Sequence, residues 1–545
     1  MMAIQPVLRR PEPATDRLLP RAAEIAVVVL LVLTLRLPSL FEPHHYGDEG
    51  VFAATAQQML AGDTLYREIW DNKPPLVFLI YAAVIAAAGP SIAALHLTGA
   101  IWSAATALVV LAIGRRVGGE VAGWLAALLY AVVASLPMIE GTLLLTEHLM
   151  VLPAALAALL TLQGAAQRGR RRDRLIAGAG VALGIACLFK QVAIFDAAAA
   201  GLWLICLRGR PRRDAAVLVL GWATPVMATA LWFAASGALG SAWEALVGSY
   251  NTYLGEGSAL PAGFQILRLL PTIVALGWLL WRRRRGQVDG NDLLLIWLSF
   301  TVLGATTGGR PFGHYLIQVV APLVLVTVYL TPRPPSLAGK GVHSSTEGAS
   351  ISSGNTDDPR SILVDEDAPF PAREGGAVSA ANRVRYLVLS LTLLTLITGF
   401  RGFWFSHPTL TPDYYGNWLA FVTGNKTRDE HDRFSSWRVS NQQHLLRMIE
   451  SDKSSPTLYI WGEYPWLYSL LDAENAAPFS TAYQTAILPG SKELVMRAIE
   501  RDPPRYIAQE LEEWRRLPGL AEFLAARYER VSQIDNTVLW RRVER

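Results

Sequence analysis

The stretch YGDEGVFAATAQQMLAGDTLYREIWDNKPP, residues 46–75, carries an Asp-Glu pair near its start and Asp-Asn-Lys-Pro-Pro at its end. It follows the first long apolar run of the chain, at about residues 22–40. Cytoplasmic loops of membrane proteins carry an excess of Lys and Arg. The loop at residues 41–73 shows the opposite bias, because it sets six acids (Glu42, Asp48, Glu49, Asp63, Glu68, Asp71) against two bases (Arg67, Lys73). It therefore predicts an acidic pocket on the outer side of a membrane.

The composition indicates a membrane protein with several spans. Hydrophobic residues make up 52% of the 545 residues, charged residues 17%, and the mean hydropathy is +0.29. These values are typical of a polytopic membrane protein. Arginines cluster between apolar runs, at residues 168–174, 208–213 and 282–285. Such clusters mark the cytoplasmic ends of membrane helices, so the net charge of +4 does not indicate a nucleic-acid partner.

Long apolar runs predict the membrane helices. The first run is too long for a signal-peptide core and is interpreted as a retained anchor. A further run, residues 74–89, lies between two positions expected outside, so either it does not cross the membrane or a boundary is wrong; we favour a juxtamembrane or re-entrant helix. We expect eleven crossings, within a range of about 11 to 13, and an outer C-terminus. The crossing runs are 22–40, 92–113, 120–136, 144–163, 174–189, 191–207, 214–236, 264–281, 291–308, 311–331 and 384–402.

The predicted fold class is an α-helical polytopic membrane protein with a small C-terminal extracytoplasmic α/β domain. The expected segments are a cytoplasmic tail (1–21), a transmembrane module (22–331), a disordered cytoplasmic linker (332–383), a last span (384–402) and the domain (403–545). The linker is rich in Ser, Gly, Pro and acids, which bury too little apolar surface to order it. In the domain, strands are predicted at 456–462 and 504–508, helices at 493–500 and 521–528, and a hairpin at 531–543.

Polar clusters that the cytoplasmic arginine bias does not explain all fall on the predicted outer face. They are Asp48-Glu49, Asp71-Asn72-Lys73, Glu147-His148, Lys190-Gln191 and Arg310-Pro311-Phe312-Gly313-His314-Tyr315. Carboxylates can orient or deprotonate an attacking hydroxyl. Lys, Arg and His can hold a phosphate as negative charge develops on it. We therefore predict one site for a reaction with an anionic leaving group.

Each cluster also has a structural interpretation that the sequence leaves open. Asp48-Glu49 and Glu147-His148 could cap helices, since acids favour helix N-termini. Lys73 could be an interfacial anchor, and Lys190 a turn residue between two helices. Arg310 and His314 could pair with lipid headgroups. A divalent cation is possible among these acids, but no spacing of ligands requires one, and no other cofactor is expected.

Residues 46–75 resemble the first external loop of the polyprenyl-phosphate-sugar-dependent glycosyltransferases of the GT-C fold. That group includes the protein O-mannosyltransferases and the lipid A aminoarabinose transferase. The resemblance continues at Thr146-Glu147, at Lys190 after "GIACLF", and at "RPFGHY" (310–315) before a helix with Gln318 and Pro322. It covers about residues 22–331 and extends weakly to Tyr459-Ile460-Trp461-Gly462.

The resemblance implies that the transmembrane module is catalytic, in the inner (plasma) membrane. It would transfer a sugar, with inversion, from a polyprenyl-phosphate donor to a hydroxyl of a protein, lipid or glycan on the outer face. By motif, Asp48 would be the base or acceptor-orienting acid and Glu49 its support. The implied substrate-binding residues are Lys73, Asp71, Glu147, His148, Lys190, Arg310, His314 and Tyr315.

One departure and two rival functions accompany the resemblance. Relatives often carry an arginine near the start of the 92–113 helix, where this chain has His96-Leu97-Thr98, so either His96 substitutes or that donor contact is absent. A transporter or flippase of a lipid-linked sugar would place charges near helix midpoints and show two repeated halves. This chain has its charges at helix ends. A non-catalytic scaffold that acts through its external domain is the other rival.

Overall fold

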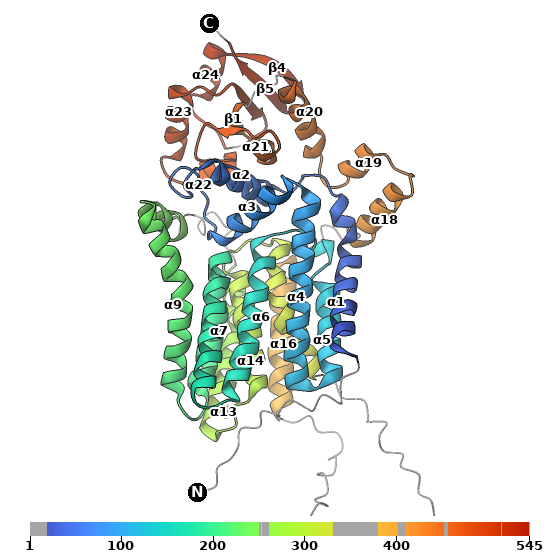
Figure 1. Ribbon diagram of the computed structural model, residues 1–545, viewed down its shortest axis with the longest axis vertical. Coiled ribbons are helices and arrows are strands. Elements are labelled where there is room, and N and C mark those ends of the chain that lie inside the picture. Colours follow the sequence, from blue (N-terminus) through green and yellow to red (C-terminus); the bar gives the residue numbers. More distant parts are fainter. Residues whose placement is uncertain are drawn as a thin grey trace, which may run out of the picture.

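The computed structural model consists of a long helical bundle with a small domain at one end of it (Figure 1). Its described residues are 19–249, 252, 261–330, 380–401, 410–451, 456–513 and 515–543. Most of the predicted tail (1–21) and linker (332–383) lies outside these residues. The architecture confirms the predicted fold class.

The bundle contains the helices that the apolar runs predicted. Within the described residues, six segments are long and apolar enough to cross a membrane: 21–41, 92–118, 146–165, 211–235, 262–285 and 313–330. Shorter apolar helices stand beside them. The number of crossings stays a prediction. The bundle helices are α1 (Arg21–Arg36), α4 (Ile92–Gly118), α5 (Glu120–Val133), α6 (Thr146–Ala165), α7 (Gly169–Phe189), α8 (Ile194–Cys206), α9 (Pro211–Ala235), α13 (Leu270–Arg285), α14 (Gly290–Thr306), α15 (Ile317–Leu330) and α16 (Ala380–Gly399).

Small residues let neighbouring helices approach closely, as is common in membranes. A Cβ at Gly180 of α7 would lie 2.1 Å from the carbonyl oxygen of Leu218 in α9. A Cβ at Gly221 of α9 would lie 2.3 Å from the carbonyl oxygen of Ala177. Only glycine fits at these two positions, so α7 and α9 pack backbone against backbone.

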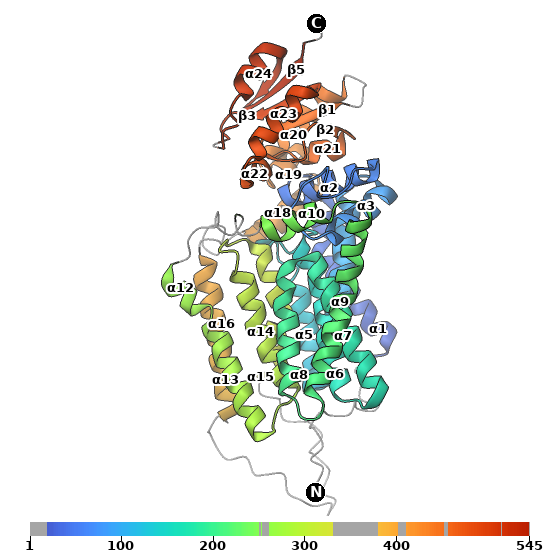
Figure 2. The ribbon, with the colours of Figure 1, turned by 90° about the vertical axis from the view of Figure 1, so that its left-hand side faces the viewer.

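The arginine clusters lie at the end of the bundle away from the C-terminal domain, where α13 ends (Figures 1 and 2). Several are paired there with acids of the neighbouring helix. Arg172 Nε lies 3.0 Å from Asp214, Arg210 lies 3.1 Å from Asp173, and Arg282 lies 2.7 Å from Asp289. These pairs join α7 to the start of α9, and α13 to the start of α14, at that end of the bundle.

One predicted span is interrupted. The run 264–281 forms two helices, α12 (Ala262–Leu267) and α13, which meet at Arg268 and Leu269. Pro271 stands in the first turn of α13. Proline lacks the N–H that a continuous helix needs, but it fits the first turn of a new one. The predicted span is therefore present, with a break near its start.

At the opposite end of the bundle, short elements lie between it and the C-terminal domain. The run 74–89 forms α3 (Leu76–Ala88), whose 13 residues span about 20 Å at 1.5 Å per residue, less than the hydrocarbon layer of about 30 Å. It packs on α2 (Gly47–Ala61), where the Phe52 ring lies 5.7 Å from that of Phe78. This is the arrangement expected of a juxtamembrane helix (Figures 1 and 2). The other elements there are η2 (Leu37–Phe41), η3 (Pro137–Ile139), η4 (Gln191–Ala193), α10 (Leu239–Trp243), η5 (Glu244–Gly248) and η6 (Gly313–Leu316).

The C-terminal domain is built on a five-stranded sheet in the order β2-β1-β3-β5-β4. β1 is parallel to both β2 and β3, whereas β5 is antiparallel to both β3 and β4. Leu458, Ile460, Ile507 and Leu539 are fully buried in it. The predicted strands, helices and hairpin are all present. The strands are β1 (Thr457–Trp461), β2 (Glu474–Asn475), β3 (Tyr506–Glu510), β4 (Tyr528–Ile534) and β5 (Thr537–Arg542).

Short helices surround the sheet and connect it to the bundle. α23 buries Val495 and Ile499 on one face, at the spacing of a single helical turn. α21 and α22 lie at the side of the domain that faces α2 (Figure 1). The helices are α18 (Leu410–Val422), α19 (Arg428–Arg433), α20 (Arg438–Glu450), α21 (Trp466–Leu470), α22 (Ala482–Ile487), α23 (Ser491–Arg501) and α24 (Leu520–Arg527).

Candidate functional site

A pocket opens where the ends of several bundle helices meet the loop before α3. Four separate parts of the chain line it, so most of the polar clusters noted in the sequence share one place. The lining residues are Asn72, Lys73, Lys190, Gln191, Val192, Gly304, Gly308, Tyr315 and Gln318.

Lys190 supplies a cation at this pocket. The chain leaves α7 at Lys190 with an extended backbone, so its side chain stands free of the helix. The ammonium forms an ion pair with Glu147 in the first turn of α6. It also lies 4.3 Å from the centre of the Tyr315 ring, a cation–π distance. Glu147 accepts a second hydrogen bond, of 2.8 Å, from the Thr146 hydroxyl.

His314 joins this pair to a carboxylate that the sequence analysis missed. Its Nδ1 bonds to Glu140, and its Nε2 lies 3.6 Å from Glu147. The Tyr46 hydroxyl lies 3.2 Å from the same Nδ1. Glu140 adopts a φ of 57°, and Glu140 also accepts a 3.0 Å hydrogen bond from the His314 backbone N–H. Burial opposes ionisation of Glu140, but the His314 bonds outweigh it and lower the pKa of this carboxyl.

The Lys73 loop is held by the side chain of Asp71. One Asp71 oxygen accepts a 2.8 Å hydrogen bond from the Lys73 backbone N–H. The Lys73 ammonium donates to the Asn72 side chain at 3.0 Å, and Gln191 donates to the Asn72 carbonyl at 2.9 Å. The loop is thereby joined to the residue that follows Lys190. Burial, and to a smaller extent the charge of Asp48, raise the pKa of Asp71.

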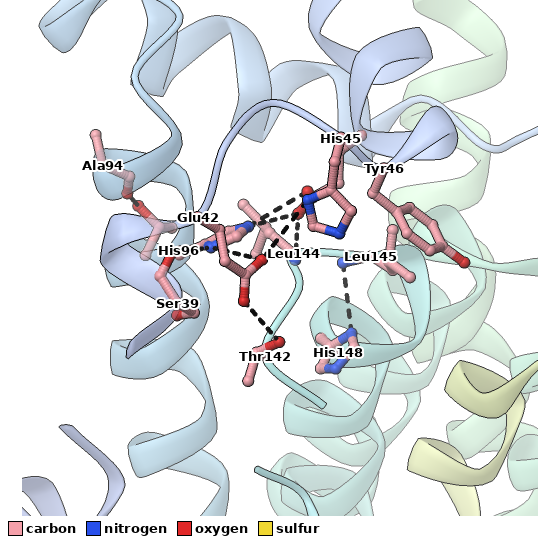
Figure 3. A network of polar contacts seen from close by, with 12 residues as sticks. Ser39, Glu42, His45, Tyr46, Ala94, His96, Thr142, Leu144, Leu145 and His148 are labelled. Atoms are coloured by element: carbon pink, nitrogen blue, oxygen red, sulfur yellow. Dashed lines mark hydrogen bonds and ion pairs between the residues drawn. The ribbon is translucent and has the colours of Figure 1, made fainter. Parts of the chain in front are cut away.

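Glu49 points away from the pocket into the protein. It is completely buried, lies 3.2 Å from His96 Nε2 and accepts a 2.7 Å hydrogen bond from the Leu144 backbone N–H. His96 Nδ1 is bonded to the Ser39 carbonyl at 2.8 Å. Figure 3 shows His96 between Ser39, Glu42 and Leu144. Burial disfavours the Glu49 charge, but His96 and the Leu144 N–H outweigh it and lower the pKa of Glu49.

This arrangement bears on two questions that the sequence left open: whether Glu49 caps α2, and whether His96 takes the place of a donor-binding arginine. α2 has no side-chain capping bond at its N-terminus, so Glu49 is the acidic half of a buried pair rather than a cap. Both nitrogens of His96 are engaged and His96 does not line the pocket, which argues against its substituting for a donor-binding arginine.

Asp48 differs from its neighbour because it is partly exposed. Among the residues that the structure describes, no hydrogen bond or ion pair engages its side chain. It lies near Asp71 and Tyr46, since its charge contributes to the raised pKa of each, after burial. Asp48 is therefore a carboxylate without a structural partner beside the Lys73 loop.

Two expected residues have other surroundings. Arg310 bonds to the hydroxyl of Tyr483 in the C-terminal domain and does not line the pocket. His148 is buried, and its Nδ1 accepts a 3.4 Å hydrogen bond from the Leu145 backbone N–H at the start of α6 (Figure 3). Its geometry is therefore that of a helix cap.

Arg268 is a second residue that the sequence analysis missed. Its Nη1 donates at 2.9 Å to the carbonyl of Thr306, two residues before Gly308 of the pocket. Its Nε is buried and has no hydrogen-bond partner among the described residues. The sequence did not single out Arg268 because it lies within the apolar run 264–281. The structure places it at the break between α12 and α13.

The possible divalent cation has no preformed ligand set in the described part of the chain, where no group of three His, Cys, Asp or Glu side chains is placed to hold a metal.

These features define a polytopic membrane protein with a polar site near the end of its bundle that meets the C-terminal domain. Residues 72–233 match the family model for dolichyl-phosphate-mannose-protein mannosyltransferases. No curated protein matches the sequence significantly.

Two solved structures of ArnT share this fold over nearly the whole chain. ArnT from Cupriavidus metallidurans bound to undecaprenyl phosphate superposes with a TM-score of 0.56 at 14% identity, over 96% of this chain and 98% of ArnT. Its apo form gives 0.55 and 15%, over 95% and 98%. The oligosaccharyltransferase AglB from Archaeoglobus fulgidus gives 0.45 and 11%, over 90% and 69%. The family match and the ArnT-like fold confirm the resemblance to GT-C glycosyltransferases.

Proposed function

We propose that this protein is a membrane glycosyltransferase that moves a sugar from a polyprenyl-phosphate donor to an acceptor hydroxyl. The observation that carries the proposal is the pocket lined by both Lys73 and Lys190, near Asp48, whose carboxylate has no partner among the described residues. The ArnT of similar fold was solved with undecaprenyl phosphate bound, which supports a lipid phosphate as the ligand here.

The two lysines are suited to bind the phosphate. Each ammonium has three N–H donors, and both lysines line the pocket in addition to their contacts with Asn72 and Glu147. Gln191, Tyr315 and Gln318 add neutral polar groups to the same wall. Arg268 lies behind Gly308 and is a further candidate for a lipid-phosphate contact.

The reaction would be a direct displacement. Asp48 takes the proton of the acceptor hydroxyl, and the oxygen attacks the anomeric carbon of the sugar. The bond from that carbon to the phosphate oxygen breaks, and the polyprenyl phosphate leaves with the electron pair. The lysines stabilise the charge that builds on this phosphate. Attack opposite to the leaving group inverts the anomeric carbon.

The outer face is the proposed side of the reaction. The arginine clusters lie at the far end of the bundle from the pocket, and such clusters favour the cytoplasm. We therefore assign the pocket and the C-terminal domain to the extracytoplasmic side of the inner membrane, where a hydroxyl on a protein, lipid or glycan would be the acceptor.

Labelled donors test the proposal. Membranes containing the protein are given a panel of radiolabelled polyprenyl-phosphate sugars, and the label is followed into lipid, protein and glycan fractions. Transfer that requires Asp48 supports a transferase. A flippase would move the donor between leaflets and leave its sugar–phosphate bond intact. Repeating the assay with EDTA tests the possible divalent cation, which stays a prediction.

A further inference from the structure

We infer that α22 of the C-terminal domain is a clamp that sets the distance between two loops of the pocket, with Gln484 and Tyr483 as positioning residues. The inference deepens the proposed function and rests on it. It assigns a task to the external domain, whose role the sequence left open.

Gln484 holds the loop that carries Lys73. Its side chain is buried, and its Nε2 donates to an Asp71 oxygen at 2.9 Å and to the Trp70 carbonyl at 3.4 Å. The other Asp71 oxygen accepts from the Lys73 backbone N–H at 2.8 Å. One carboxylate thus connects Gln484 to the backbone of a pocket lysine.

Further contacts fix this side of the clamp. Trp70 N–H donates at 2.8 Å to the Pro478 carbonyl, and the Trp70 ring lies 5.5 Å from that of Phe479. The Gln484 side-chain oxygen accepts a hydrogen bond from the Ser480 backbone N–H at 2.9 Å. This bond orients the amide so that its nitrogen faces Asp71.

Tyr483, the preceding residue, holds the second loop. Its hydroxyl bonds to Arg310, three residues before Gly313, where η6 with His314 and Tyr315 begins. The guanidinium carbons of Arg310 and Arg515 lie 5.6 and 5.2 Å from the centre of its ring. Arg515 in turn lies 3.1 Å from Glu463, which accepts a 3.1 Å hydrogen bond from the Tyr483 backbone N–H.

The base of the clamp is the sheet. The Ala482 N–H donates at 3.1 Å to the carbonyl of Gly462, the residue that follows β1. Consecutive residues of one helical turn therefore bind two loops that are more than two hundred residues apart in the chain. A displacement of α22 would change the distance between Lys73 and Tyr315. The ammonium of Lys190 lies over the ring of Tyr315, so the relative positions of the two lysines would change as well.

The effect should be felt in binding of the lipid phosphate. Gln484→Ala removes the amide that holds Asp71 and keeps both lysines in the protein. The backbone at Lys73, which is bonded to Asp71, should therefore become more mobile. We expect the Kd for undecaprenyl phosphate to rise about five- to tenfold, the lower part of the range for coupling between separate sites. Tyr483→Phe removes one oxygen only and provides a second variant that should fold normally.

Matched controls make the same chemical changes inside the domain. Gln509→Ala breaks a 3.0 Å bond from the Trp540 indole, and Tyr528→Phe breaks a 2.6 Å bond to the Pro504 carbonyl. Neither residue contacts the pocket loops. Both controls should bind undecaprenyl phosphate like the wild type.

The experiment uses the full-length protein in detergent and has two measurements. Hydrogen exchange should accelerate at residues 70–75 in Gln484→Ala and at 309–316 in Tyr483→Phe, but not in the controls. Undecaprenyl phosphate titrations then give the change in Kd. In an Asp71→Asn background, Gln484→Ala should add little, because it acts through Asp71.

The outcomes separate the two proposals. If the wild type neither binds undecaprenyl phosphate nor transfers sugar, the proposed function fails, and the exchange data alone decide the clamp. If the wild type binds it but the α22 variants match their controls in exchange and Kd, the clamp is refuted. A full effect of Gln484→Ala in the Asp71→Asn background would equally refute a route through Asp71.

Discussion

Lys190 and Glu147 form an ion pair that joins the C-terminal end of α7 to the first turn of α6. Glu147 is completely buried and Lys190 only partly so, because Lys190 faces the pocket. The cation is therefore held at a fixed place before any ligand arrives, and His314 supports the same carboxylate from the other side.

Lys190→Ala should weaken binding of undecaprenyl phosphate by about tenfold to a hundredfold, the value of a hydrogen bond to a charged group. The substitution also leaves Glu147 buried without its cation, which by itself destabilises the protein. The double variant Lys190→Ala/Glu147→Gln removes that penalty and isolates the binding loss. Equal affinity of the double variant and the wild type would show that Lys190 does not hold the phosphate.

Asp48→Asn should lower the rate of sugar transfer by about 10²- to 10⁴-fold, the usual contribution of a general base. Binding of the lipid donor and thermal stability should change little, because Asp48 makes no bond to the described residues. Asp63→Asn, an exposed acid on the same loop, is the control. Normal turnover by Asp48→Asn would refute its role as the base.

Glu49→Ala should reduce the free energy of unfolding by about 3–5 kcal/mol, since it removes the nearer carboxylate partner of the buried His96. The Leu144 N–H also loses its acceptor. Thermal unfolding in detergent measures the effect. The loss should shrink when His96→Leu is added, whereas a mild effect of Glu49→Ala alone would mean that the pair contributes little to the fold.

Glu463 predicts a pH dependence of stability. Burial raises its pKa to about 7, against 4.5 for an exposed glutamate, with Arg515 opposing the shift. Between these pH values the folded protein keeps a proton that the unfolded chain releases, so its stability falls as the pH rises from about 4.5 to about 7. Glu463→Gln cannot ionise, so it should exceed the wild type in Tm at pH 8 and match it most closely near pH 5. A Tm difference independent of pH would contradict this assignment.

Much of the fold could be predicted because it depends on simple patterns. The bundle follows from apolar runs of sufficient length, and the strands β1 and β3 from short runs of β-branched and aromatic residues. Helix breaks were harder. Arg268 falls within one apolar run, and its backbone geometry depends on Pro271 and on the packing of α12.

The site was only partly predictable. Motifs located Lys73, Lys190 and Tyr315, which line one pocket. They could not separate Asp48 from Glu49, because which of two adjacent acids turns inward depends on His96 and on the Leu144 N–H, distant in sequence. The sequence did not single out Glu140 for the same reason, since its role depends on η6 placing His314 beside it.

Two bonds between the C-terminal domain and the segment before α2 end on main-chain carbonyl oxygens. The Trp466 indole donates to the Tyr46 carbonyl at 3.0 Å, and the Gln442 amide to the His44 carbonyl at 2.9 Å. Every amino acid supplies this acceptor, so replacing the side chains at these two positions would spare both bonds. The seat of the domain is thus held in part by main-chain atoms, and these two bonds do not depend on which side chains stand at residues 44 and 46.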